Sequence, residues 1–213
     1  MCGQGTLSGV LAATLVSVAA QAQVLKVVEV GAPAINCVFQ TDCTIPVTDT
    51  TGNILLPTIG TGTAWLQSRT FAGETGAPGA GTTGYEYRIS MTQASGTSDC
   101  IVSFTLNFGP HKQLPYKNGQ LADVYVVTTG GLGTISLAKA ERFGDVVEFT
   151  LSKSLCVNGG ASIANTTYFI GLAATAAPMH VNARIATTGP TPIFGADARV
   201  PTHSVPADPP GGL

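Results

Sequence analysis

The chain has 213 residues, and 10% of them are charged, against about a quarter in an average soluble domain. Twelve acidic and ten basic side chains give a formal charge of −2 and are scattered singly along the sequence. The absence of a basic stripe or polybasic patch argues against nucleic acid and against an anionic membrane surface as partners. Gly, Thr, Ala and Val dominate the remainder. Thr and Val favour strands and Gly favours turns, a mixture typical of exported β-proteins.

The N-terminal segment predicts export. The apolar run Val10–Ala20 ends in a small-x-small pattern, so residues 1–22 are predicted to be a signal peptide that is cleaved between Ala22 and Gln23. The run is shorter than the ~20 apolar residues of a membrane-spanning helix, so we expect no transmembrane helix in the mature chain. Residues 1–9 contain no Lys or Arg. That leaves two alternatives open, a start inside a longer gene or a buried N-terminal element.

The cysteines predict two disulfides. Removal of Cys2 with the signal peptide leaves Cys37, Cys43, Cys100 and Cys156, an even number in an exported chain. Of the three connectivities, we favour Cys37 with Cys43 and Cys100 with Cys156. The cysteines form no C-x-x-C pair and have no His nearby, so we expect no metal ligands and no cofactor.

Period-two alternation predicts half-buried strands. The predicted strands, in chain order, are residues 24–30, 64–70, 85–92, 100–108, 124–128, 146–151, 168–172 and 181–185. The cleanest is 85–92, in which Tyr85, Tyr87, Ile89 and Met91 point inward and Glu86, Arg88, Ser90 and Thr92 point outward.

Other segments predict different structure. Ile135–Arg142 is predicted to form a short helix, and the Gly-rich residues 73–84 a long mobile loop. Residues 187–213 contain six prolines and are predicted to be a disordered Pro/Gly-rich tail. The sequence therefore predicts an all-β, antiparallel sandwich over residues 23–186, immunoglobulin-like or jelly-roll-like and stapled by disulfides.

No catalytic set is predicted. The histidines are His111, His180 and His203, and each lies in a loop, at a strand entrance or in the tail. Ser162 lies in a loose version of the G-x-S-x-G pattern that lacks the final Gly and precedes a loop. A Ser or an acid within hydrogen-bond reach of His111 or His180 would favour a hydrolase.

Three further patterns have ordinary structural interpretations. Asp49–Asn53 offers oxygens to Ca²⁺ but lacks the spacing of a calcium loop, so a plain turn is expected. Asn165 begins a glycan acceptor triplet. Trp65, Tyr85 and Tyr87 could line a sugar-binding face, although core packing accounts for the tyrosines more simply.

Three stretches resemble exported bacterial surface proteins of unassigned function. Two are Asp123–Gly131 and Tyr168–Ala173. The third is similar to the opening of the Ile-Pro-Thr-Leu-type C-terminal sorting signal, and it consists of Val200, Pro201, Thr202, His203 and Ser204. The apolar helix and basic end that follow this opening are absent from residues 206–212. The resemblance implies a protein handled by a surface-sorting pathway, with a degenerate or truncated signal.

These observations predict a secreted or cell-surface structural or adhesive β-module without catalytic activity. Its expected partner is a cell-surface or extracellular polymer, either glycan or protein. The alternative is an extracellular carbohydrate-binding module, which exposed aromatic side chains gathered on one sheet face would favour. A third interpretation is a secreted hydrolase that uses His111 or His180.

The export prediction is tested by N-terminal sequencing of secreted protein. We expect Gln23 at the N-terminus, because Ala20 and Ala22 fit the small-residue requirement of a signal peptidase. Recovery of secreted protein that begins at Met1 would contradict it.

Overall fold

The computed structural model describes residues 21–54, 61–95, 99–116, 119–157, 166–189 and 193–204, with the backbone alone at 61, 62, 193 and 194. The apolar run of the predicted signal peptide lies outside these residues, as do Ser162 and Asn165.

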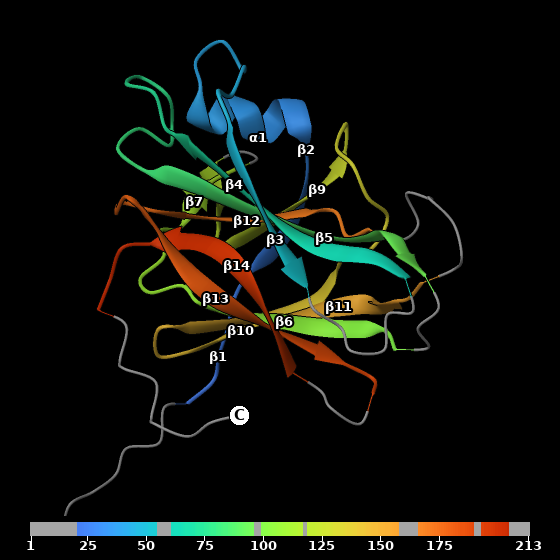
Figure 1. Ribbon diagram of the computed structural model, residues 1–213. Coiled ribbons are helices and arrows are strands. Elements are labelled where there is room, and N and C mark those ends of the chain that lie inside the picture. Colours follow the sequence, from blue (N-terminus) through green and yellow to red (C-terminus); the bar gives the residue numbers. More distant parts are fainter. Residues whose placement is uncertain are drawn as a thin grey trace, which may run out of the picture.

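Two six-stranded sheets pack face to face (Figure 1). Sheet A contains, in spatial order, β1 (Gln23–Val24), β10 (Leu137–Phe143), β11 (Val146–Leu155), β6 (Ile101–Asn107), β13 (Pro178–Thr187) and β14 (Ile193–Pro201). Sheet B contains β2 (Val27–Gly31), β9 (Val124–Thr129), β12 (Phe169–Ala174), β5 (Thr83–Ser95), β4 (Thr61–Ala72) and β3 (Thr48–Ile54). A small separate pair consists of β7 (Leu114–Pro115) and β8 (Leu121–Ala122). The predicted all-β sandwich is confirmed.

The core between the sheets follows the predicted alternation. The inward side chains of β5 are at most 1% exposed: Tyr85, Tyr87, Ile89 and Met91. They meet aromatic side chains of sheet A, where the stacked rings of Phe104 and Phe149 lie 4.6 Å apart. Buried aromatic pairs of this kind add to the free energy of burial.

The strand pairing departs from the prediction at one edge of sheet B. Strand β2 pairs with β9 in parallel, Val27 opposite Val124, whereas an antiparallel sandwich was expected. The two strands are far apart in the sequence, so no tight hairpin turn forces them to run in opposite directions.

A helix that the sequence analysis did not predict, α1 (Ala32–Phe39), covers part of the outer face of sheet B (Figure 1). Pro33 lies in its first turn, where a missing N–H costs nothing. Its buried residues are Ile35, Val38 and Phe39, and Phe39 meets Phe71 of β4 edge to face at 4.8 Å. Within the described ranges, no helix has the length and apolar character needed to cross a bilayer.

Both predicted disulfides are confirmed. Cys37 of α1 is bonded to Cys43 just beyond the helix, and Cys100 before β6 is bonded to Cys156 after β11. The second closes a loop with a sequence separation of 56, which in the chain-entropy model stabilises the fold by about 4 kcal/mol.

The predicted helix over Ile135–Arg142 is wrong, because most of this segment is strand β10. Ala140 pairs with Phe149 of β11 and is fully buried. Gly144, with φ of 62°, turns the chain between the two strands. The hairpin pairing therefore overrides the local helical tendency.

The loop of residues 73–84 is held in place, contrary to the mobile loop predicted. Gly73 N–H donates to Thr82 O at 2.7 Å, and Gly79 N–H donates to Val38 O of α1 at 2.6 Å. Thr41 Oγ1 donates to the Glu74 carboxylate at 2.6 Å. The loop and the disulfide-bonded end of α1 thus hold each other.

The prediction of a disordered tail is wrong for residues 193–204. Strand β14 pairs with β13 over its whole length, and its alternate residues Ala196, Ala198 and Val200 belong to the core. Two of these inward residues are alanines, which give only a weak apolar alternation in the sequence. The sandwich therefore extends beyond the predicted boundary at residue 186.

Strand β14 also closes one side of the sandwich, since it lies beside β3 of the other sheet (Figure 1). Arg199 N–H donates to Ser68 Oγ at 3.2 Å, and Tyr87 Oη donates to Arg199 O at 2.5 Å. A Cβ atom on Gly52 of β3 would lie 2.4 Å from Asp197 O. Glycine is therefore required where the two backbones approach each other.

Gly52→Ala should lower the free energy of unfolding by about 1–3 kcal/mol, because the added methyl group forces the two strands apart. Denaturant unfolding measures the change. The neighbouring exposed residue provides the control, and Asn53→Ala should stay within about 0.5 kcal/mol. Equal stability of the two variants would contradict the close contact between β3 and β14.

Candidate functional site

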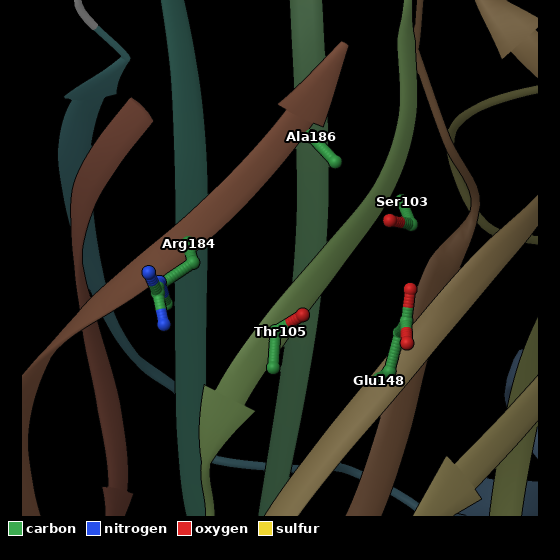
Figure 2. A pocket seen from close by; sticks show the side chains of 5 residues that line it. All are labelled: Ser103, Thr105, Glu148, Arg184 and Ala186. Atoms are coloured by element: carbon green, nitrogen blue, oxygen red, sulfur yellow. The ribbon is translucent and has the colours of Figure 1, made fainter. Parts of the chain in front are cut away.

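A shallow groove crosses the outer face of sheet A and has a volume of about 180 Å³. Figure 2 shows the side chains that line it, which come from β6, β11 and β13: Ser103, Thr105, Glu148, Arg184 and Ala186. In this view the Thr105 hydroxyl and the Glu148 carboxylate turn toward the same part of the groove, and Arg184 lies on the other side of Thr105.

Strand register explains this grouping. Thr105 of the middle strand β6 lies opposite Glu148 on one side and opposite Arg184 on the other. Ser103, two residues earlier and therefore on the same face, lies opposite Ala186. An acid, a base and two hydroxyl groups thus occupy adjacent positions.

None of the four polar side chains of the groove makes a hydrogen bond or an ion pair within the described part of the chain. Lys139, near Glu148, is instead paired with Glu141 at 2.6 Å. The carboxylate, guanidinium and hydroxyl groups of the groove are therefore available to hydrogen-bond a ligand.

His111 has an acid within hydrogen-bond reach, but both of its ring nitrogens are occupied. Nε2 lies 2.9 Å from Asp123 Oδ1. Nδ1 lies 3.0 Å from Arg142 Nη1, and a guanidinium nitrogen can only donate a hydrogen bond. Nδ1 is thus the acceptor and Nε2 the donor. Burial raises the pKa of Asp123, but hydrogen bonds from Lys26 N–H, His111 and Gln113 outweigh it and hold that pKa below its usual value. His111 is a structural element of this network, not a free base.

His180 forms an exposed pair with an acid of the neighbouring strand. Its Nδ1 lies 2.9 Å from Asp197 Oδ2, and both side chains are about half exposed. The pair borders a shallow hollow together with Val181 and Asn182. Among the described residues, no hydroxyl or thiol group hydrogen-bonds to His180.

The segment similar to a sorting signal is docked on the sandwich where the structure describes it. Val200 is fully buried and Pro201 pairs with Pro178. His203 lies 2.9 Å from Asn107 Oδ1 through Nε2, and its ring contacts the backbone at Gly109. The third histidine of the chain is therefore also occupied in holding the fold together.

The aromatic residues considered for a sugar-binding face do not share one. Tyr85 and Tyr87 lie in the core, whereas Trp65 is half-buried on the outer face of sheet B, against Arg88. The turn expected at residues 49–53 is wrong, because they belong to β3. The carboxylate of Asp49 is bound there by Arg69 and Gln67 of β4.

The outer face of β5 carries a buried acid, Glu86, which the alternation had predicted to point to solvent. Glu86 is 3% exposed. In register across the sheet lie Asp49, Arg69, Glu86, Gly171 and Tyr125, each opposite the next. Because Gly171 has no side chain, the Tyr125 ring lies across β12 toward Glu86, in space that a Cβ would fill. The row thus spans the sheet from an exposed carboxylate to a buried phenol.

The electrostatics of this row favour a neutral Glu86. Burial raises the pKa of Glu86 to about 7, although Arg69, 3.9 Å away, and Tyr125 act in the opposite direction. The Tyr125 hydroxyl interacts with that carboxyl, and it is buried without a hydrogen-bond partner among the described residues. Arg69 bonds Asp49 through both Nε and Nη2, so its main partner is the more exposed acid.

Sequence reasoning missed both polar arrangements. The residues of the groove were visible in the sequence as outward-facing positions of predicted strands: Thr105, Glu148 and Arg184. They can be recognised as neighbours only when β6 is known to lie between β11 and β13. Glu86 carried no signal, since alternation assigns it to a solvent face.

Comparisons with protein-family models, with curated proteins and with solved structures found no match to this chain. Among the described residues, no group of three or more His, Cys, Asp or Glu side chains is placed to hold a metal ion.

Glu86 should make stability fall as the pH rises. Its pKa is about 7 in the folded chain against an ordinary value of 4.5, so the folded state binds the proton more tightly. The stability contributed by the neutral carboxyl is fully present below pH 4.5 and is lost as the pH rises through 7. The difference between the two pKa values corresponds to about 3 kcal/mol.

Glu86→Gln should therefore gain stability relative to the wild type as the pH rises from 4.5 to 8, as measured by denaturant unfolding at each pH. The exposed Glu29→Gln serves as the control and should follow the wild-type curve. Parallel curves for Glu86→Gln and the wild type would contradict the buried neutral acid.

Proposed function

We propose that this chain is a secreted or cell-surface adhesive β-module that holds an extracellular polymer without chemical conversion. The two disulfides are compatible with an oxidising location outside the cytoplasm. The core between the sheets is filled by large side chains, so the surfaces offered to a partner are the outer faces of the sheets.

The groove of sheet A is the observation that carries this proposal. Glu148 and Arg184 flank Thr105 without pairing with each other or with another described residue. A carboxylate accepts, and a guanidinium donates, hydrogen bonds that are stronger than those between neutral groups. The groove therefore suits a partner that is rich in both donors and acceptors.

The size of the groove favours a polymer over a free small molecule. Its volume of about 180 Å³ is below the ~300–1,000 Å³ of enclosed small-molecule pockets. A contact this small holds one unit of a repeating chain, and several weak contacts along one polymer together give firm attachment.

A carbohydrate-binding module is the second candidate, and the hydroxyl groups of the groove favour it. Ser103 and Thr105 both donate and accept hydrogen bonds, as sugar hydroxyls do. The Glu148 carboxylate accepts from two such hydroxyls at once, a geometry that a neighbouring pair on a sugar ring provides. Under this candidate the polymer is a glycan, whereas the adhesive proposal also admits a protein.

The test is binding of the full secreted chain to arrays of immobilised glycans and of immobilised extracellular proteins. Glu148→Gln and Arg184→Gln should each weaken binding to the recognised polymer about tenfold, since one hydrogen bond to a charged group is worth roughly 1.5–3 kcal/mol. Glu29→Gln and Lys153→Gln remove exposed charges outside the groove and should leave binding unchanged.

The array identifies which candidate holds. Groove-dependent binding to a glycan supports the carbohydrate-binding module, and groove-dependent binding to a protein supports adhesion to protein. Binding that is insensitive to both groove variants, or no binding on either array, would contradict the assignment of this groove.

A further inference from the structure

Arg88, on the outer face of β5, lies close to two aromatic rings. Its guanidinium carbon lies 5.0 Å from the centre of the Trp65 ring and 5.1 Å from that of Phe169. Phe169 is 4% exposed, and Arg69 lies over the same ring at 4.4 Å. Cation–π contacts of this kind fix the plane of a guanidinium group.

A chain of hydrogen bonds fixes Arg88 further. Its Nε donates to Gln67 Oε1 at 3.1 Å. The amide nitrogen of Gln67 donates to Asp49 Oδ2 at 2.9 Å, which decides which way the Gln67 amide points. Asp49 is itself held by Arg69. The position of Arg88 is therefore determined by three strands, β3, β4 and β5.

Within the described ranges, no acidic side chain pairs with Arg88. Asp49 is occupied by Arg69, and the two terminal nitrogens of Arg88 make no hydrogen bond within the described residues. Burial and the nearby Arg69 lower the pKa of Arg88, whereas Asp49 acts in the opposite direction. The Arg88 guanidinium group is thus half-buried, positively charged and fixed in orientation. It has no described anion to which its two terminal nitrogens could donate hydrogen bonds.

The surroundings indicate the kind of anion. Trp65 lies beside Arg88, and the strand β3 carries exposed polar neutral residues opposite this site, Asn53 across from Trp65 and Thr51 across from Gln67. An aromatic ring next to hydroxyl and amide groups suits a sugar ring. An acidic peptide would need further cations, but the neighbouring arginine, Arg69, is already paired with Asp49.

We propose that Arg88 and Trp65 form a binding site for the carboxylate-bearing sugar unit of an acidic polysaccharide. The terminal nitrogens of Arg88 donate hydrogen bonds to the carboxylate, and the sugar ring packs against the accessible part of Trp65. Asn53 and Thr51 lie on the same face of the sheet and form hydrogen bonds with the sugar hydroxyls. This site goes beyond the proposed function, because it lies on the opposite sheet from the groove and selects a charged unit.

The test uses the full secreted chain and titrates it with oligogalacturonate, with a neutral galactose oligomer of the same length and with poly-glutamate. We expect binding of oligogalacturonate that is at least tenfold tighter than binding of either comparison, and that weakens as salt is raised. Arg88→Gln should remove this preference, and Arg88→Lys, which keeps the charge but not the fork, should weaken it about tenfold.

Controls separate a specific loss of binding from a general loss of charge and from misfolding. Lys153→Gln and Glu29→Gln each remove an exposed charge that lies outside both sites, and both variants should leave oligogalacturonate binding unchanged. Thermal melting of each variant checks that the fold is retained, and Trp65→Phe, which keeps an aromatic ring, should weaken binding less than Arg88→Gln.

Each remaining outcome overturns the proposal. Equal affinity for the neutral oligomer would show that the site does not recognise the carboxylate. Equal or tighter binding of poly-glutamate would show that the ligand is an acidic peptide instead. Loss of binding in Glu148→Gln but not in Arg88→Gln would place the site in the groove, and absence of oligogalacturonate binding to the wild type would refute the site while leaving the groove to its own test.

Discussion

Most residues of strand β5 are buried, on both of its faces, and the arrangement of the other elements follows from this constraint. One face carries Tyr85 and Tyr87 into the core, where sheet A covers them. The other face carries Glu86, which is buried although it is an acid. A strand in this position needs neighbours on both sides and a cover on each face. Sheet B supplies the neighbours, sheet A covers the inner face, and flanking side chains cover the outer one.

The cover on the outer face explains why polar and aromatic groups are mixed there. Helix α1 and its disulfide-bonded end cover the region around Phe39 and Phe71. Beyond the helix, the guanidinium groups of Arg69 and Arg88 cover Phe169. Arginine suits this role because its flat, weakly hydrated group stacks on a ring while remaining able to bond an anion. The same residues that shield the sheet therefore create the binding site that we propose.

Much of the core could be predicted from the sequence because alternation encodes one buried face. Seven of the eight predicted strands each correspond to one strand of the structure, whereas the predicted strand 24–30 is divided between β1 of sheet A and β2 of sheet B. The inward residues of β5 and of Val146–Leu151 are buried as expected. Alternation predicts that one face of each strand is exposed to solvent. This prediction was wrong at Glu86, because the outer face of β5 is covered there. The spacing of Ile35, Val38 and Phe39, together with Pro33 in the first turn, is consistent with a short helix, which the prediction from the sequence lacks.

The candidate sites could not be predicted from the sequence, because each joins residues from three strands. Thr105 acquires its charged neighbours through pairing with both β11 and β13, and Arg88 acquires Trp65 and Gln67 through pairing with β4. The residue types were visible, whereas their neighbours depend on strand order. Strand order is set by which surfaces bury each other, and this is a property of the whole chain.

By itself, the sequence determined the all-β class and the inward faces of the central strands, since these depend on local alternation. Its four mature cysteines predicted two disulfides but left three connectivities, and the tertiary structure decided the pairing. Only the tertiary structure decided that β10 is a strand and that residues 193–201 belong to the sandwich. Two of the three inward core residues of β14 are alanines, and at Gly52 the backbone of β3 comes so close to β14 that no side chain fits. Small residues bury little apolar surface and give a weak signal in sequence, but they are the residues that a close contact between two backbones requires.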